Sequence, residues 1–350
     1  MINSGDLYPW FVFSNILVGV VLSLGLGWLS IRIARAIRLI DVPGILPHKK
    51  HGTATPLAGG LTLVLVLAVG GFVFNYTMVL ELWPILVPTL IIFAMALWDD
   101  YKRLPPTVKF AGQISAAVIL VALGTYVQVI PRGVLGLPGD IYIYLNYLIT
   151  ILWVVGVTNA FNFIDSMDGL VVGVQGIAIA FLILVSLGSD QVSLLRILTL
   201  LMGCSVGLYY YNMSPARFFM GDSGAQTTGF LLAALGILYT PQQFPQASSW
   251  FLPILILGVP IFDTCLVVFS RLRHGTPVYQ AGRDHTYHRL VSLGLDTNRA
   301  VAIMHVAAIL LGCIAFILLN LSPVPANIVF ALVIIVGVMI YLFLDKQHEG

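Results

Sequence analysis

Long apolar runs alternate with short polar segments along the whole chain. Eleven runs are predicted as membrane-spanning helices, at about 11–31, 57–74, 84–98, 108–129, 143–158, 170–187, 192–210, 225–239, 250–269, 299–319 and 325–344. Several are shorter than the roughly 20 residues that a helix needs to cross a bilayer, so their true ends lie a few positions away. We therefore predict an all-α polytopic membrane protein of about 11 transmembrane helices, with residues 1–350 forming a single integral-membrane domain.

Composition and charge agree with this pattern and add an orientation. The chain is 59% hydrophobic, and its apolar runs are too long and too little interrupted for a water-soluble core. If the amino terminus lies outside, 15 of the 17 Lys and Arg residues fall in inner segments, and only Arg132 and Arg196 fall outside. Because Lys and Arg gather in cytoplasmic loops, we predict an outer amino terminus and a cytoplasmic carboxyl terminus. The basic residues are otherwise dispersed, so nucleic acid is not an expected partner.

Polar residues gather in the segment NAFNFIDSMDGL, which lies between two apolar runs. Asn159, Asn162, Asp165 and Asp168 follow one another at steps of three. Residues three apart are neighbours on a helical turn, so this spacing predicts a rim of oxygen ligands at a membrane boundary. Such a rim suits a hard cation and a phosphate substrate. A helix cap followed by a solvated loop is the alternative, because Asn and Asp also favour those positions.

Other acidic residues stand at the ends of apolar runs or inside them. Asp99 and Asp100 are adjacent, so on a helix they point about 100° apart and need not share a ligand position. Pairing of Asp99 with Lys102 or Arg103 is the alternative to a catalytic role. Asp222 lies between glycines, where backbone can approach a ligand closely.

Asp263 lies inside an apolar run, where an acid is a functional candidate by default.

Two basic segments complete the candidate chemistry. Lys49, Lys50 and His51 lie between prolines, and they either contact a substrate phosphate or anchor the chain to anionic lipid. His285 and His288 are three apart and have arginines beside them, which favours a phosphate-binding patch over a zinc site, since zinc would want further ligands nearby. Carboxylates that hold Mg²⁺, together with cations from other loops, indicate phosphoryl transfer.

Five motifs, PHKKHGTATPLAGG, WDDYKR, NAFNFIDSMDGL, FFMGDSG and GRDHTYHRL, follow one another between residues 47 and 295. In this order the chain resembles the polyprenyl-phosphate N-acetylhexosamine-1-phosphate transferases. The resemblance implies a bundle of ten or eleven helices in the plasma (inner) membrane, with an active-site cleft on the cytoplasmic face. It also implies that undecaprenyl or another polyprenyl phosphate attacks the β-phosphate of a UDP-N-acetylhexosamine and releases UMP. Relatives are commonly dimers, so a homodimer is expected by analogy alone.

The resemblance also implies roles for individual residues. Asp222 corresponds to the principal ligand of Mg²⁺ or Mn²⁺, and Asn162 to a second ligand. Lys109 corresponds to a lysine that contacts the pyrophosphate, and Phe219 to a ring that stacks on uracil. The remaining catalytic candidates are Asp99, Asp100, Asp165, Asp168, His285 and His288. The remaining substrate-binding candidates are Lys49, Lys50, His51, Asn159 and Arg283.

Two departures from the family pattern bear on these roles. Arg103 stands where the family often has a third Asp, which puts a three-carboxylate site in doubt. Tyr287 replaces the middle histidine of the last motif, and it cannot supply a cationic contact at neutral pH. This loop favours transfer of N-acetylglucosamine-1-phosphate, with a phospho-N-acetylmuramoyl-pentapeptide transferase as the alternative. An ion-coupled transporter is the rival from another class, and Asp263 is its main support.

Overall fold

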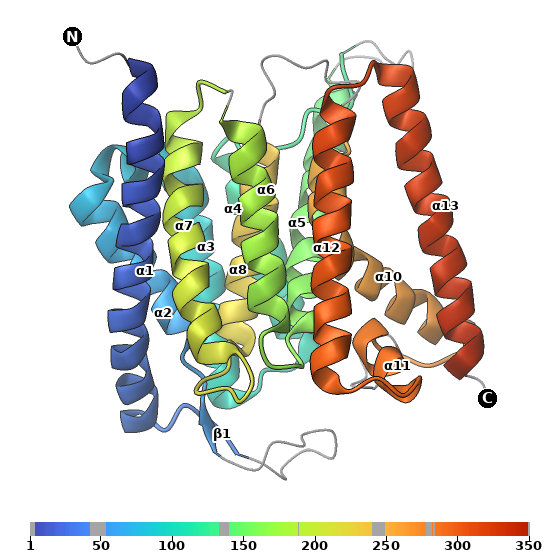
Figure 1. Cartoon of the computed structure of the whole chain (residues 1–350), viewed down its shortest axis with the longest axis horizontal. Coiled ribbons are helices and arrows are strands. Elements are labelled where there is room, and N and C mark those ends of the chain that lie inside the picture. Colours follow the sequence, from blue (N-terminus) through green and yellow to red (C-terminus); the bar gives the residue numbers. More distant parts are fainter. Residues whose placement is uncertain are drawn as a thin grey trace.

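The computed structural model describes residues 4–42, 54–132, 140–187, 189–239, 249–277, 282 and 284–348. Its helices stand side by side in one bundle, and a small antiparallel sheet lies at the lower end (Figure 1). This sheet pairs β1 (Ile40–Asp41) with β2 (Thr55–Pro56). The first helix begins at the upper end of the bundle, and the last helix ends at the lower end.

Helices account for all the predicted apolar runs. The helical elements are α1 (Ser4–Ala36), α2 (Gly59–Val69), the π-helix η1 (Gly70–Phe74), α3 (Tyr76–Lys102), α4 (Pro106–Ala122), α5 (Ile141–Ile164), α6 (Leu170–Ser186), α7 (Val192–Asn212), α8 (Gly221–Leu238), α9 (Leu252–Ile256), α10 (Gly258–Arg273), α11 (Thr286–Ser292), α12 (Thr297–Leu319) and α13 (Pro323–His348). Each of the eleven runs overlaps one helix or two consecutive helices, which confirms a polytopic all-α membrane protein. Six helices within the described ranges are long and apolar enough to cross a bilayer alone: α1, α3, α5, α7, α12 and α13. The total of eleven spans stays a prediction.

The helix α8 is the centre of the bundle. Every residue from Ser223 to Gly236 is buried, and α2, α3 and α5 pack along it. Gly229 permits the contact with α5, because a Cβ there would lie 2.9 Å from the Cα of Thr158. Small residues allow this close approach of helices in membranes. The packing brings the first turn of α8 to the carboxyl ends of α3 and α5.

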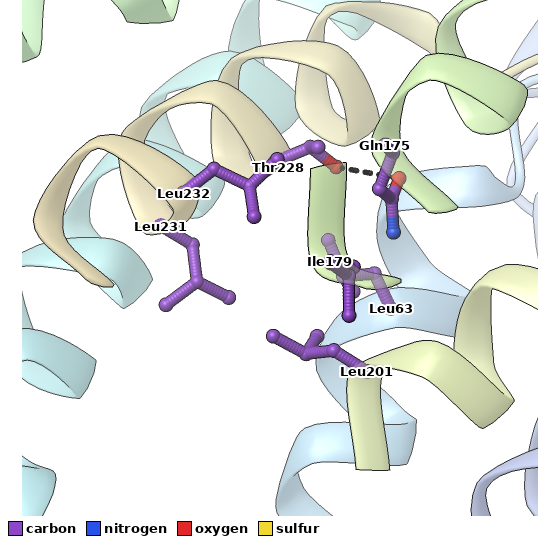
Figure 2. Close-up of a pocket in the computed structure, with 7 residues that line it drawn as sticks. All are labelled: Leu63, Gln175, Ile179, Leu201, Thr228, Leu231 and Leu232. Atoms are coloured by element: carbon purple, nitrogen blue, oxygen red, sulfur yellow. Dashed lines mark hydrogen bonds between the residues drawn. The ribbon is translucent and has the colours of Figure 1, made fainter. Parts of the chain in front are cut away.

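A small cavity lies between α2, α6, α7 and α8 (Figure 2). Its volume is about 10 Å³, which is close to the space that one water needs. Thr228 donates a hydrogen bond of 3.3 Å to Gln175 on its wall, and Gln175 donates one of 2.9 Å to Ser205. The lining contains none of the acidic candidates: it consists of Leu63, Gln175, Ile179, Leu201, Thr228, Leu231 and Leu232. This cavity is therefore separate from the candidate site.

Candidate active site

The first turn of α8 is held by Asp100, at the end of α3. Asp100 Oδ1 accepts a hydrogen bond of 2.8 Å from the backbone N–H of Asp222, and Oδ2 accepts one of 3.0 Å from that of Ser223. These N–H groups have no partner within a helix, and a carboxylate also complements the helix dipole at this end. Gly221 enters the helix with φ at +68°, and a Cβ there would lie 2.8 Å from Asp100 Oδ2. Glycine is therefore required for this approach.

Lys109 links the other acidic residue of α3 to α8. Its Nζ lies 2.8 Å from Asp222 Oδ2 and also forms an ion pair with Asp99 Oδ2. Asp99 is buried, and its Oδ1 accepts a hydrogen bond of 2.7 Å from the backbone N–H of Leu104. The two adjacent aspartates thus have different partners, as their angular separation on a helix predicts. The alternative pairing of Asp99 with Lys102 or Arg103 is wrong.

Amide side chains extend this network away from the aspartates. Gln226, one turn after Asp222, donates a hydrogen bond of 3.3 Å to Asp222 Oδ2. Gln113 donates a hydrogen bond of 3.0 Å to Gln226, and Asn159 donates one of 2.7 Å to Gln113. Gln113 and Gln226 are buried, and their bonds offset the cost of burying amides. Sequence reasoning did not select these two glutamines, although each is an amide inside an apolar run and was detectable on that ground.

The helical spacing expected for Asn159 to Asp168 holds only in its first part. The helix α5 ends at Ile164, so Asp165 and Asp168 lie in the turn that follows. Asn162 is in the last turn of α5, and its backbone carbonyl accepts a hydrogen bond of 3.4 Å from the N–H of Asp165. Asp168 Oδ2 accepts 3.1 Å from the N–H of Ala216. Leaving the helix directs the two carboxylates toward the segments beside α8, which a continuous helix would not do.

Asp165 lies among other carboxylates. Removal from water and the charges of Asp222, Asp100 and Asp168 raise the pKa of Asp165 well above its usual value, although a hydrogen bond from the Gly221 N–H opposes the shift. A cation bound here would relieve this repulsion. The turn after α5 is therefore part of the same electrostatic site as the first turn of α8.

Phe219 is positioned by main-chain bonds. Its N–H donates a hydrogen bond of 2.9 Å to the Pro56 carbonyl. Its own carbonyl accepts hydrogen bonds of 3.2 Å from the N–H of Ala58 and 3.1 Å from that of Gly59. The ring is half-buried, three residues before Asp222. The end of β2 and the residues that follow it therefore fix the loop that leads into α8.

The histidine motif packs on the end of α5. His285 immediately precedes α11 and is buried, whereas His288 is half-buried one turn later. The rings of Phe163 and His285 are 5.9 Å apart. Tyr287 is fully buried, and its hydroxyl donates a hydrogen bond of 3.1 Å to the Phe163 carbonyl. Burial raises the pKa of Tyr287 well above its usual value, so its hydroxyl stays a neutral donor. Tyr287 therefore joins the histidine motif to the turn that carries Asn162 and Asp165.

The side chains at this site include oxygen donors that Mg²⁺ prefers. Within the described ranges, no three His, Cys, Asp or Glu side chains are arranged to hold a metal by themselves. Mg²⁺ does not need such a cage, because it is usually bound by one or two carboxylates, waters and substrate phosphates. The carboxylates of Asp222 and Asp165, whose charges interact, fit a hard divalent cation, and Asn162 lies one turn before Asp165. They offer no soft ligand for zinc.

Comparison with known proteins identifies the family. Residues 82–240 match the profile of glycosyl transferase family 4. A decaprenyl-phosphate N-acetylglucosaminephosphotransferase of Mycobacterium leprae is 31% identical over 327 residues, which cover 81% of this chain and 79% of that relative. The chain belongs to glycosyl transferase family 4. The resemblance inferred from the motifs is confirmed.

Two further relatives of this glycosyl transferase family 4 chain differ in coverage. A Bacillus subtilis protein named a probable undecaprenyl-phosphate N-acetylglucosaminyl 1-phosphate transferase is 29% identical over 319 residues, covering 91% of this chain and 87% of its own. A phospho-N-acetylmuramoyl-pentapeptide-transferase of Levilactobacillus brevis is 30% identical over 217 residues, covering 57% of this chain and 66% of its own. The N-acetylglucosamine relatives thus match more of the chain.

The residues matched to glycosyl transferase family 4 include Lys109 and the aspartates around it. Asp99, Lys109, Asp165 and Asp222 all fall within residues 82–240, and the histidine motif follows them. Four further candidates lie outside the described residues: Lys49, Lys50, His51 and Arg283.

Proposed function

We propose that the chain transfers N-acetylglucosamine-1-phosphate from UDP-N-acetylglucosamine to a polyprenyl phosphate such as undecaprenyl phosphate. The products are polyprenyl-diphospho-N-acetylglucosamine and UMP. The observation that carries the proposal is the bridge from Lys109 to Asp99 and Asp222, which sets one cation among several carboxylates at the meeting point of α3, α4 and α8. The names of the relatives that match most of the chain support the same sugar and the same lipid.

The reaction requires one bond to form and one to break. An oxygen of the lipid phosphate attacks the β-phosphorus of the UDP-sugar, the bond from this phosphorus to the bridging oxygen breaks, and UMP leaves with the electron pair. The lipid phosphate is already anionic near neutral pH, so a strong general base is not obligatory. Positioning and neutralisation of charge should supply most of the catalysis.

The acidic residues and Asn162 divide into two groups in this proposal. Asp222 and Asn162 would hold Mg²⁺, with Mn²⁺ as a substitute, and Asp165 and Asp168 would add negative charge near it. When bound, the cation neutralises charge on the diphosphate. Asp100 keeps the first turn of α8 in place, because both of its carboxylate oxygens accept backbone N–H groups there. Asp99 holds the ammonium group of Lys109.

The basic and aromatic residues would bind the nucleotide sugar. Lys109 would exchange a carboxylate partner for the pyrophosphate, and Phe219 would stack on uracil. His285 and His288 would contact phosphate oxygens, with Lys49, Lys50, His51, Asn159 and Arg283 as further substrate contacts. The positive-inside distribution of Lys and Arg supports a cytoplasmic site in the plasma (inner) membrane, where a soluble nucleotide sugar meets a lipid.

UMP release from the purified protein tests this function. With UDP-N-acetylglucosamine, polyprenyl phosphate and Mg²⁺, we expect UMP and a lipid-linked sugar, and EDTA should stop both until Mg²⁺ is restored. Asp222→Asn should lower the rate by about 100-fold or more, since losing a metal ligand costs several kcal/mol of transition-state stabilisation. An unchanged rate and Mg²⁺ dependence would refute the assignment of Asp222.

Parallel assays with three UDP-sugars decide the substrate. Turnover with UDP-N-acetylglucosamine alone supports the proposal, whereas turnover with UDP-N-acetylmuramoyl-pentapeptide or UDP-N-acetylgalactosamine alone replaces the proposed sugar. UMP formation with none of them rejects the transferase. Cross-linking in the membrane would test the homodimer.

A further inference from the structure

Asp263 has no part in the chemistry proposed above, although it is a fully buried acid in the second turn of α10. Both of its carboxylate oxygens point to the start of α11. Oδ2 lies 2.7 Å from Nδ1 of His285, and Oδ1 accepts a hydrogen bond of 2.6 Å from the backbone N–H of Thr286. Asp263 thus contacts a candidate phosphate-binding histidine and the residue that follows it.

Aromatic rings hold the same imidazole on its other sides. Tyr287 stacks on His285 with ring centroids 5.2 Å apart and an angle of 10° between the ring planes. Phe163 meets it edge-on at 5.9 Å. Since Phe163 is the neighbour of Asn162, the imidazole is fixed directly beside the turn that carries the candidate metal ligand.

The acid also decides where the proton of the ring lies. A carboxylate only accepts hydrogen bonds, so Nδ1 of His285 must be the donor. The partner of one ring nitrogen determines what the other can do. Within the described part of the chain, the imidazole of His285 makes its hydrogen bond through Nδ1, so Nε2 is the nitrogen left for a substrate oxygen.

We infer that Asp263 is a positioning residue that orients His285 and keeps a proton on its Nδ1, so that Nε2 faces the phosphate groups of the nucleotide sugar. This inference rests on the proposed function. It also gives Asp263 a role that needs no ion pathway, which removes the main support for a transporter.

Asp263→Asn separates this role from a purely structural one. The amide oxygen can still accept from Thr286, but the amide N–H₂ group faces Nδ1 and drives the ring proton to Nε2. We expect kcat to fall by about 10- to 100-fold, the usual effect of losing a residue that orients a functional ligand. In a His285→Gln background the same change should cost less than about twofold, because the two residues act as one unit.

Asp345→Asn is the matched control, since Asp345 is another fully buried acid that holds α11. Its Oδ1 accepts a hydrogen bond of 3.1 Å from the guanidinium group of Arg289, and it does not contact His285. Its effect on kcat should persist in the His285→Gln background. If the loss from Asp263→Asn also persists there at full size, or if Asp263→Asn is fully active, the inference is overturned.

Nitrogen-15 NMR of histidine-labelled wild-type protein in nanodiscs tests the inference without relying on the activity of a variant. The His285 signal, assigned by its loss in His285→Gln, should show a protonated Nδ1. A bare Nδ1 with the proton on Nε2 overturns the inference even if the enzyme is active. Absence of UMP release from the wild type with every UDP-sugar rejects the proposed function instead, so the two failures are distinguishable.

Discussion

Asp100 accepts a hydrogen bond of 2.8 Å from the backbone N–H of Asp222, 122 positions later in the chain. This contact fixes the distance between the two acidic motifs, because it joins the end of α3 to the first turn of α8. The side chain of Asp222 stays available for Lys109 and Gln226. Asp100 thus supports the position of Asp222, the residue on which the proposed chemistry depends.

Asp100→Ala should destabilise the protein. The substitution leaves the N–H groups of Asp222 and Ser223 without their acceptor, which costs about 1 to 3 kcal/mol. We expect a lower melting temperature in detergent and reduced UMP release. Asp140→Ala is the control, since Asp140 is exposed and makes no side-chain bond to the helix it precedes. Equal melting temperatures for the two variants would contradict this role of Asp100.

Gly221→Ala should lower both stability and activity. The backbone at this position has φ of +68°, which costs an L-residue about 1 to 2 kcal/mol, and the new Cβ would press on Asp100. Thermal unfolding and UMP release measure the effect. Gly25→Ala, in α1, provides the comparison because a Cβ there meets nothing within 4 Å. If both variants behave like the wild type, the close approach at Gly221 is not needed.

Lys109→Gln should weaken the interaction with the nucleotide sugar. It removes the cation between Asp99 and Asp222, whose charges would then repel each other and the diphosphate. Loss of a charge-assisted hydrogen bond is worth about 1.5 to 3 kcal/mol, so kcat/KM should fall by about 10- to 100-fold. Lys102→Gln removes an exposed lysine at the end of α3 and should have little effect. An equal loss in both variants would mean that net charge, not the bridge, matters.

Tyr287→Phe should loosen the histidine motif while keeping the ring that stacks on His285. It removes the hydroxyl that donates 3.1 Å to the Phe163 carbonyl, at a cost of about 1 kcal/mol. We expect a modest fall in melting temperature and a KM for the UDP-sugar that rises a few-fold. The exposed Tyr144 gives a neutral comparison as Tyr144→Phe. Wild-type KM and stability would show that the bond to Phe163 is dispensable.

Most of the apolar helices could be located from the sequence alone, although the runs do not include α11 and do not divide α9 from α10. A helix in lipid must satisfy its own backbone and present apolar side chains over its length, so each span is recorded locally in the chain. The same rule made the acids and amides conspicuous, because polar groups are costly in an apolar run unless they have partners. Asp99, Asp100, Lys109, Asp165 and Asp222 were all selected on sequence grounds, and the structure brings them together.

The partners of these residues could not be predicted in this way. Lys102 and Arg103 are nearer to Asp99 in the chain than Lys109 is, yet Arg103 adopts a left-handed conformation that ends α3, and the chain returns as α4 with Lys109 beside Asp99. The helical spacing from Asn159 onward likewise failed after Ile164, where α5 ends.

The sequence by itself determined the membrane class, the helices and the family, because hydropathy and motifs are properties of short segments. Only the tertiary structure decided that Asp100 holds the first turn of α8, that Asp99 and Asp222 share Lys109, and that Asp263 holds His285. These contacts join residues on different helices. Periodicity along one helix defines neighbours within that helix, but the choice of packing partner depends on how whole helix surfaces fit together.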